Sequence, residues 1–275
     1  MAQVAQRLWR RIKTALPSPV RQRATVLVRS CLSRMDQWRR RSARYQFTHS
    51  RMTKQLTDQV VRSVHRQDEF FVAYAAAQIS KSLDSTRGHM LGPLLMDRTE
   101  RLVRLLDQAL PVERGSLVVL CVGCRNTQEL THIARICRVG RVQGLDLFSD
   151  DPRIHVGDMH AMPFSAGSFD VVYACHSLEH AYDLRRALAE CVRVAKPGGL
   201  LVIEMPVHFP LSATDHWDVG SSAILLTYLA DAVTEVLLQD DAPETVRVIV
   251  RVVCATHHEP VAQPIGQTHG HDDCT

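Results

Sequence analysis

The sequence predicts an α/β fold with a doubly wound, mostly parallel sheet. A continuous apolar run, residues 117–122, stops at Gly123 and is followed by a helical pattern. Such a run is typical of a strand buried on both faces, and the glycine permits a tight turn that a ligand can approach closely. A second short strand, residues 142–146, ends in Asp146. An acidic residue at this spacing is placed to accept hydrogen bonds from ribose hydroxyls, so the two strands predict a site for a nucleotide-like ligand.

The elements that follow alternate between strand and helix, as such a sheet requires. A helix over 128–138 links the first two strands, and Pro197-Gly-Gly199 is predicted to be a turn. A helix over 223–232 precedes a terminal hairpin of strands 233–238 and 245–253, in which apolar and polar residues alternate. The other predicted elements are a strand at 169–174, a helix at 183–195 and a strand at 200–204.

The chain upstream of the sheet is basic and helical. Residues 1–66 contain 16 Lys and Arg against 2 Asp and Glu, whereas the remainder contains 17 against 27. A helix over 58–82 is expected to dock on the sheet domain, and a second, over 96–110, leads into the first strand. The predicted organisation is a basic helical arm at 1–54, a helical cap segment at 55–110, the sheet domain at 111–255 and a polar, disordered tail at 256–275.

Two amphipathic helices are predicted within the arm, at 1–16 and 20–45. The first carries an apolar stripe that includes Leu8 and Ile12, with Trp9 at its margin, as expected at a lipid headgroup boundary. Three interpretations stay open: a solvated charged face, contact of residues 1–45 with an anionic membrane or an acidic partner, and a mitochondrial transit peptide. The expected location is cytoplasmic, with membrane association or mitochondrial import depending on the arm.

Several motifs between the strands occur in a recognisable order. They are Gly157-Asp-Met159, His176-Ser-Leu-Glu-His180 and Lys196-Pro-Gly-Gly199, and they follow the glycine turn and Asp146. Over residues 117–206 the chain resembles the class I S-adenosylmethionine-dependent methyltransferases, in particular the small-molecule branch that includes quinone and sugar methylases. The resemblance implies a seven-stranded, Rossmann-like methyltransferase sheet with S-adenosyl-L-methionine as cofactor.

The resemblance also implies which residues hold the cofactor. The glycine turn faces its methionine part, the acid after the second strand binds the ribose, and the Asp-Met pair flanks the adenine. The implied cofactor-binding residues are Val122, Gly123, Cys124, Arg125, Asp146, Leu147, Asp158, Met159, His176 and Ser177.

The glycine turn departs from the usual pattern of the family. Arg125 and Thr127 replace two of its three glycines, giving a variant Gly-Cys-Arg-Asn turn. Asn126 tolerates a left-handed conformation, so the turn can still close. The guanidinium of Arg125 is suited to pair with the cofactor's carboxylate. The alternative interpretation is a catalytically inactive binding protein on a methyltransferase fold.

Three histidines are candidates for a general base. A hydroxyl acceptor must lose a proton during methyl transfer, and histidine titrates near neutral pH. The candidates are His208, His216 and His176, in that order, with Asp215 or Asp218 as orienting carboxylates. The expected reaction is O-methylation of a small-molecule or of a glycan- or lipid-linked acceptor, and no metal site is expected. An RNA methyltransferase that holds phosphates with the arm is the alternative, and nucleic acid is the less favoured partner.

The eight cysteines lie mostly within apolar patterns. Cys121 and Cys124 have the spacing of a redox pair or of half a zinc site, but the sequence offers no second pair to complete four ligands. Buried cysteine packs as a small hydrophobe. Core packing is therefore the favoured interpretation, and it is consistent with a reducing compartment.

Overall fold

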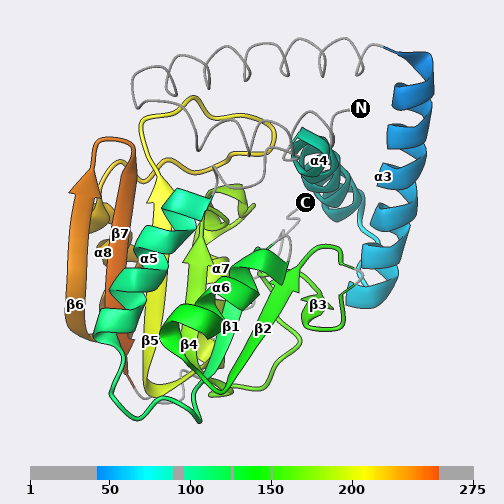
Figure 1. Ribbon diagram of the computed structural model, residues 1–275. Coiled ribbons are helices and arrows are strands. Elements are labelled where there is room, and N and C mark those ends of the chain that lie inside the picture. The colour runs from blue at the N-terminus through cyan, green and yellow to red at the C-terminus, as the bar shows by residue number, and fades with distance from the viewer. Residues whose placement is uncertain (1–41, 89–95, 125–126, 150, 254–275) are drawn as a thin grey trace, which may run out of the picture.

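A seven-stranded sheet forms the centre of the computed structural model, which describes residues 42–88, 96–124, 127–149 and 151–253 (Figure 1). The strand order is β3-β2-β1-β4-β5-β7-β6. Strand β7 is antiparallel to both of its neighbours, and the other adjacent pairs are parallel. The predicted fold class is thereby confirmed. The strands are β1 (Val118–Val122), β2 (Arg141–Asp146), β3 (Ile154–Val156), β4 (Phe169–Cys175), β5 (Ala195–Pro206), β6 (Val233–Ala242) and β7 (Thr245–Val252).

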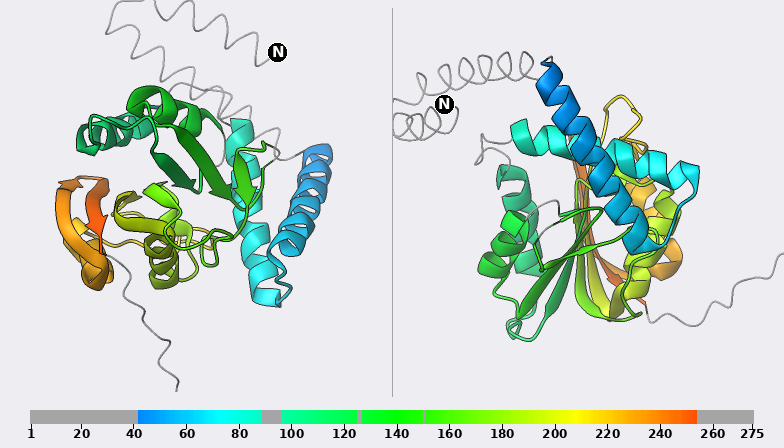
Figure 2. Two further views of the ribbon diagram at one scale, coloured as in Figure 1. Left: turned by 90° about the horizontal axis from the view of Figure 1, so that it is seen from below. Right: turned by 90° about the vertical axis from the view of Figure 1, so that its right-hand side faces the viewer.

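Two hydrophobic layers cover the faces of this sheet, because successive side chains of a strand point in opposite directions. Leu120 and Val122 of β1 pack in one layer, with helices α7 (Leu184–Val194) and α8 (Ser222–Leu229). Val119 and Cys121 pack in the other, with helices α5 (Met96–Ala109) and α6 (Thr127–Cys137). Figure 2 shows the two helix pairs on opposite sides of the sheet. Two short 3₁₀ helices, Leu178–His180 and Ala230–Ala232, complete the domain.

The predicted helix over 58–82 is two helices in the structure, α3 (Ala43–Val64) and α4 (Glu69–Gly88). Helix α3 ends because His65 adopts a left-handed conformation, with φ of 52°. The N-terminal end of α4 is capped by Asp68, whose carboxylate accepts a hydrogen bond from the backbone N–H of Phe71 at 2.9 Å. Helix α3 also runs across the boundary predicted between residues 54 and 55, so the arm and the cap segment are not separated there.

Other sequence predictions need smaller corrections or lie outside the described residues. Pro197-Gly-Gly199 is not a separate turn, since β5 begins at Ala195 and shifts its register against β4 along this stretch. The helix predicted over 1–16, most of that over 20–45, and the tail at 256–275 are outside the described residues. Among the described helices, none has the length and apolar character needed to cross a membrane.

Candidate active site

A pocket lies at the carboxyl ends of four neighbouring strands, beneath helix α4. Parallel strands present their carboxyl ends at one edge of the sheet, which is where open α/β sheets bind ligands. Helix α4 passes over this edge beside β3 (Figure 1). The lining residues come from the ends of β1 (Gly123), β2 (Leu145, Asp146, Leu147, Phe148), β3 (Gly157, Asp158, Met159) and β4 (His176, Ser177, His180), and from α4 (Tyr74, Gln78, Ser82).

Gly123 fits the floor of the pocket because it has no side chain. Its φ is +70°, a conformation that other residues rarely adopt. A Cβ built at this position would lie 2.3 Å from the Cβ of Ser177, closer than two carbon atoms can pack. The backbone N–H of Gly123 donates to the carbonyl of Leu145 at 2.8 Å, which fixes the turn against the end of β2.

Asp146 is half-buried at the end of β2 and lines the pocket together with Leu147. Its backbone carbonyl accepts a hydrogen bond from Gly157 at 2.9 Å, so the ends of β2 and β3 are held together. A carboxylate in this position can accept hydrogen bonds from ribose hydroxyls.

Asp158 lines the pocket, but its oxygens already have partners. Its Oδ1 lies 2.5 Å from Nδ1 of His160, and its Oδ2 accepts a hydrogen bond from the Tyr182 hydroxyl at 3.0 Å. Arg66, just after α3, donates to the same hydroxyl at 2.6 Å. Burial opposes ionisation of Asp158, but the hydrogen bonds and charge of His160 outweigh it and hold its pKa below the usual value. Asp158 therefore connects the end of β3 to the N-terminal helices.

Ser177 contributes an unsatisfied polar group to the pocket lining. Only 2 % of this residue is exposed, and its Oγ has no hydrogen-bond partner among the described residues. A buried hydroxyl without a partner costs about 1–3 kcal/mol, so this oxygen is a natural contact for a bound ligand.

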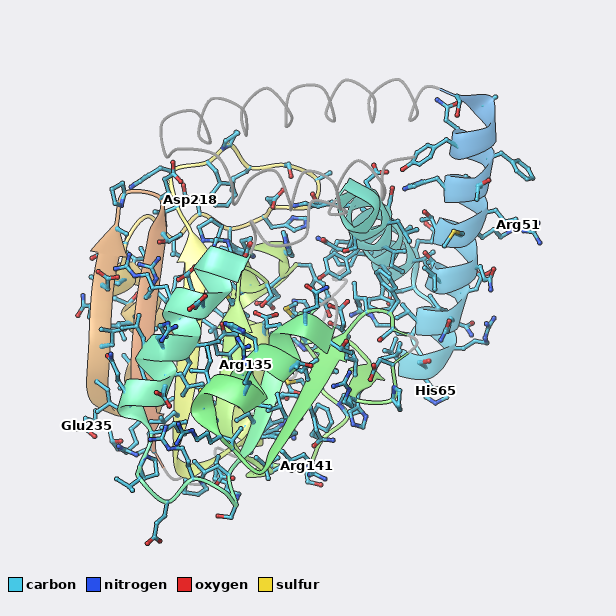
Figure 3. The ribbon with its side chains drawn as sticks, viewed as in Figure 1. Arg51, His65, Arg135, Arg141, Asp218 and Glu235 are labelled. Carbon is cyan, nitrogen blue, oxygen red and sulfur yellow. The ribbon has the colours of Figure 1, made fainter. Side chains whose placement is uncertain are left out.

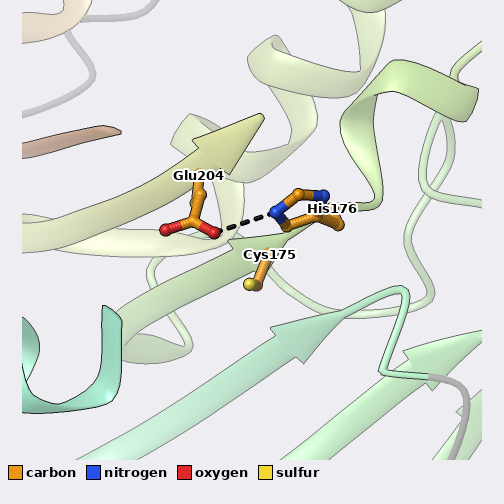
Figure 4. A group of neighbouring side chains, drawn as sticks. All are labelled: Cys175, His176 and Glu204. Atoms are coloured by element: carbon orange, nitrogen blue, oxygen red, sulfur yellow. Dashed lines mark hydrogen bonds and ion pairs between the residues drawn. The ribbon is translucent and has the colours of Figure 1, made fainter. Parts of the chain in front are cut away.

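His176 is the only one of the three predicted catalytic histidines that lines the pocket. Its Nε2 is 2.8 Å from Oε1 of Glu204 at the end of β5. Burial opposes ionisation of Glu204, but its bonds to His176 and Arg247 and their charges outweigh burial and lower its pKa. Cys175 lies beside this pair (Figure 4), and the ligand atoms of all three side chains fall within 4.8 Å of one another.

The structure does not place His208 and His216 in the pocket lining. His208 is exposed, and its backbone N–H donates to Asp218 at 2.8 Å in the loop beyond the carboxyl end of β5 (Figure 3). His216 packs near Tyr74 and its Nε2 is buried without a partner among the described residues. Burial lowers the pKa of His216. Asp215 pairs with Lys81 at 2.6 Å and lies 3.3 Å from Nδ1 of His180, which lines the pocket. The geometry favours His176 among the three candidates, and their order stays a prediction.

Three of the residues predicted to bind the cofactor lie in or beside the glycine turn: Val122, Cys124 and Arg125. The side chains of Val122 and Cys124 are buried in the two opposite hydrophobic layers, so any contact of these residues with the cofactor would have to come from their backbone. Both Cys121 and Cys124 are free and buried, in agreement with core packing. Arg125 lies outside the described residues.

The wall contributed by α4 was largely missed by sequence reasoning. Tyr74 is both a core residue and a cap over the pocket: it is 7 % exposed, packs against Tyr182 and lines the pocket. Gln78 donates a hydrogen bond to the carbonyl of Thr214 at 2.9 Å, which ties the loop after β5 to α4. The regular spacing of Phe71, Tyr74 and Gln78 on one helix face was the signal that could have revealed this wall.

Comparison with known proteins identifies the class of this domain. Residues 120–203 match the family model described as a methyltransferase domain. The chain therefore carries a class I S-adenosylmethionine-dependent methyltransferase domain.

The matched relatives resemble only part of the chain. It is 29% identical over 137 residues to an ajmaline N-methyltransferase of Rauvolfia serpentina, which covers 42% of this chain and 47% of that protein. It is 33% identical over 104 residues to a malonyl-[acyl-carrier protein] O-methyltransferase of Coxiella burnetii. That match covers 36% of this chain and 37% of the relative. Less than half of each relative is thus spanned. The fold is shared with a chain from the complex of the Haloferax volcanii Trm112 methyltransferase activator with a methyltransferase. The TM-score is 0.50 at 19% identity, and the match covers 66% of this chain and 99% of that one.

Proposed function

We propose that this protein transfers the methyl group of S-adenosylmethionine to a hydroxyl oxygen of a small-molecule or of a glycan- or lipid-linked acceptor. The observation that carries the proposal is a set of groups at four adjacent strand ends. They are Gly123 in the pocket floor, the carboxylate of Asp146, the unsatisfied hydroxyl of Ser177, and His176 paired with the buried Glu204. The first three suit the cofactor, and the fourth suits proton removal.

The cofactor, when bound, supplies an electrophilic methyl group on a sulfonium. The acceptor oxygen forms a bond to that methyl carbon as the carbon–sulfur bond breaks, and the sulfur keeps the electron pair. His176 takes the proton that leaves the hydroxyl. The positive charge that then develops on the imidazole is stabilised by Glu204, 2.8 Å away. The residues around the pocket otherwise act by alignment.

The proposal is tested with S-adenosylmethionine carrying a labelled methyl group and a panel of acceptors in matched hydroxyl and amine pairs. We expect label in hydroxyl compounds and release of S-adenosylhomocysteine. Methylation of amines alone would contradict the assignment of oxygen as the acceptor atom. A protein that does not bind the cofactor at all would contradict the assignment as a methyltransferase and favour an inactive binding protein.

Replacing Asp146 with alanine is expected to weaken cofactor binding by about 1–3 kcal/mol, because the ribose hydroxyls lose their acceptor in a partly buried site. Isothermal titration with S-adenosylmethionine measures the change. Asp151→Ala is the control, since Asp151 is a neighbouring carboxylate that pairs with Arg153 and does not line the pocket. Equal affinities for wild type and Asp146→Ala would remove Asp146 from the site.

We further propose that residues 1–45 hold the protein at an anionic membrane, on the basis of their charge and apolar stripe. Replacing Leu8, Trp9 and Ile12 together with serine should reduce sedimentation with anionic liposomes, because apolar burial supplies the part of binding that resists salt. The control is cofactor binding, which should not change. A triple variant that sediments as well as wild type would exclude the membrane and leave a nucleic-acid or protein partner, or a solvated arm.

A further inference from the structure

We infer that Glu204 and Arg247 act in the reaction through His176, by fixing its imidazole in the tautomer whose Nδ1 is free to accept the proton of the acceptor. This inference rests on the proposed function for its role in catalysis. Both residues are positioning residues. The resemblance over residues 117–206 includes Glu204 but implies no role for it, and Arg247 lies outside that stretch. The argument has three steps: how Glu204 holds His176, how Arg247 holds Glu204, and what the two together do to the imidazole.

Glu204 holds His176 at two points. Its backbone carbonyl accepts a hydrogen bond from the backbone N–H of His176 at 2.9 Å, and its Oε1 lies 2.8 Å from the imidazole Nε2. His176 has φ of 51°, a left-handed conformation that costs energy for a residue other than glycine and persists only where its surroundings impose it. In Figure 4 the second ring nitrogen lies on the side of the imidazole away from Glu204. The orientation of the ring is thus set by one residue of the neighbouring strand.

Arg247 holds Glu204 from the opposite side. The two residues are direct partners in the antiparallel register of β5 and β7, and Nε of Arg247 donates to Oε2 of Glu204. The guanidinium is itself oriented, since it donates to Asp240 and to the hydroxyl of Thr245, each at 2.8 Å. Glu204 is fully buried and Arg247 is 5 % exposed. A buried carboxylate stays ionised only with such a partner.

These contacts determine where the imidazole hydrogen sits. A guanidinium only donates hydrogen bonds, and an ionised carboxylate only accepts them. Because Glu204 must accept, Nε2 of His176 must carry the hydrogen, and the lone pair of neutral His176 is on Nδ1. The same contacts oppose a metal ion at Cys175, His176 and Glu204, because the second oxygen of Glu204 is taken by a guanidinium whose charge would repel a cation.

A glutamine at position 204 should reverse the tautomer. Its side-chain oxygen must face the donor Nε of Arg247, so its NH₂ group must face His176. Nε2 would then accept a hydrogen bond, and the hydrogen would move to Nδ1. Glu204→Gln keeps the size of the side chain and every hydrogen-bond position filled, so it alters the proton arrangement while leaving the packing in place.

The test is a long-range ¹H–¹⁵N spectrum of the full-length protein labelled in histidine, at about pH 8.5, where imidazoles are generally neutral. His176→Ala assigns the signals. We expect the Nε2–H tautomer in wild type and the Nδ1–H tautomer in Glu204→Gln. Glu235→Gln is the matched control, since Glu235 also pairs with an arginine of β7 but lies at the opposite end of the sheet (Figure 3), and it should leave the His176 signals unchanged.

An Nδ1–H tautomer in wild type would overturn the inference, even if Glu204→Gln failed to fold. An Nε2–H tautomer retained in Glu204→Gln would overturn it as well. The measurement needs neither cofactor nor acceptor, so its outcome is separate from that of the proposed function. Where methyl transfer is measurable, Glu204→Gln should lower kcat by about 10²–10⁴-fold with little change in KM. In a His176→Ala background, Glu204→Gln should have almost no further effect on kcat. A merely structural role of Glu204 would instead lower kcat in both the wild-type and the His176→Ala backgrounds.

Discussion

Replacing Arg247 with methionine is expected to lower the free energy of unfolding by about 3–5 kcal/mol at neutral pH, because it leaves the carboxylate of Glu204 buried without its permanently charged partner. Methionine retains most of the apolar stem, so the loss reflects charge rather than volume. The control is Arg251→Met on the same strand: the side chain of Arg251 is 40 % exposed and pairs with Glu235, whose side chain is 54 % exposed. That substitution should cost no more than about 1 kcal/mol. Chemical denaturation measures both values.

The effect of Arg247→Met should depend on pH. The folded-state pKa of Glu204 is lowered, so the stability that its ionisation provides is present above its unfolded pKa and is lost as pH falls through the folded value. The difference between wild type and Arg247→Met should therefore narrow as the pH falls below about 4.5, the ordinary range for glutamate. A difference that stays constant over this range, or one below about 1 kcal/mol at neutral pH, would show that the pair does not behave as a buried ion pair.

Replacing Gly123 with alanine is expected to weaken S-adenosylmethionine binding by about 2–4 kcal/mol. The added methyl group would lie 2.3 Å from the Cβ of Ser177, and φ of +70° disfavours any residue with a side chain. The turn must move, and the pocket floor moves with it. Titration calorimetry measures the loss of affinity, and denaturation measures any loss of stability.

Two further variants separate the two causes of the affinity loss in Gly123→Ala, which are backbone strain and the collision with Ser177. Gly220→Ala is the control for backbone strain alone, since Gly220 has φ of +67° but open space where its Cβ would be. It should leave cofactor binding unchanged. Combining Gly123→Ala with Ser177→Gly removes the atom that the new methyl group meets, and it should recover part of the affinity if the collision dominates. Full affinity in Gly123→Ala itself would mean that this turn does not form the floor of the cofactor site.

Local patterns predicted the first half of the sheet well. The apolar run before Gly123 and the acidic end of the next strand are signals contained within a few residues, and the structure places both Gly123 and Asp146 in the pocket. The place of His176 in the pocket was harder to predict, for the opposite reason. His208 and His216 lie in a polar loop that resembles a substrate entrance in sequence, whereas His176 is selected by Glu204, 28 positions away. Proximity in the sequence does not report such contacts.

The N-terminal helices show a second limit of sequence patterns. Helical periodicity continues through the segment from α3 into α4, and the break between them depends on His65 in a left-handed conformation and on Asp68 as a cap. Neither is a glycine or a proline, which are the strongest sequence markers of a helix end. Arg247 was hidden in a similar way, because an arginine in an alternating strand predicts a solvent-facing side chain until the register with β5 is known.

The attachment of α4 has a thermodynamic consequence. Tyr74 and Gln78 belong to the wall of the pocket and also to the contacts that fasten this helix to the sheet domain. A ligand that touches them binds the attached form better than the detached one, and linkage is reciprocal. The factor by which the ligand shifts the equilibrium towards attached α4 equals the factor by which attachment of α4 raises the affinity for the ligand. A substitution that weakens the attachment of α4 should therefore weaken ligand binding even where it does not touch the pocket.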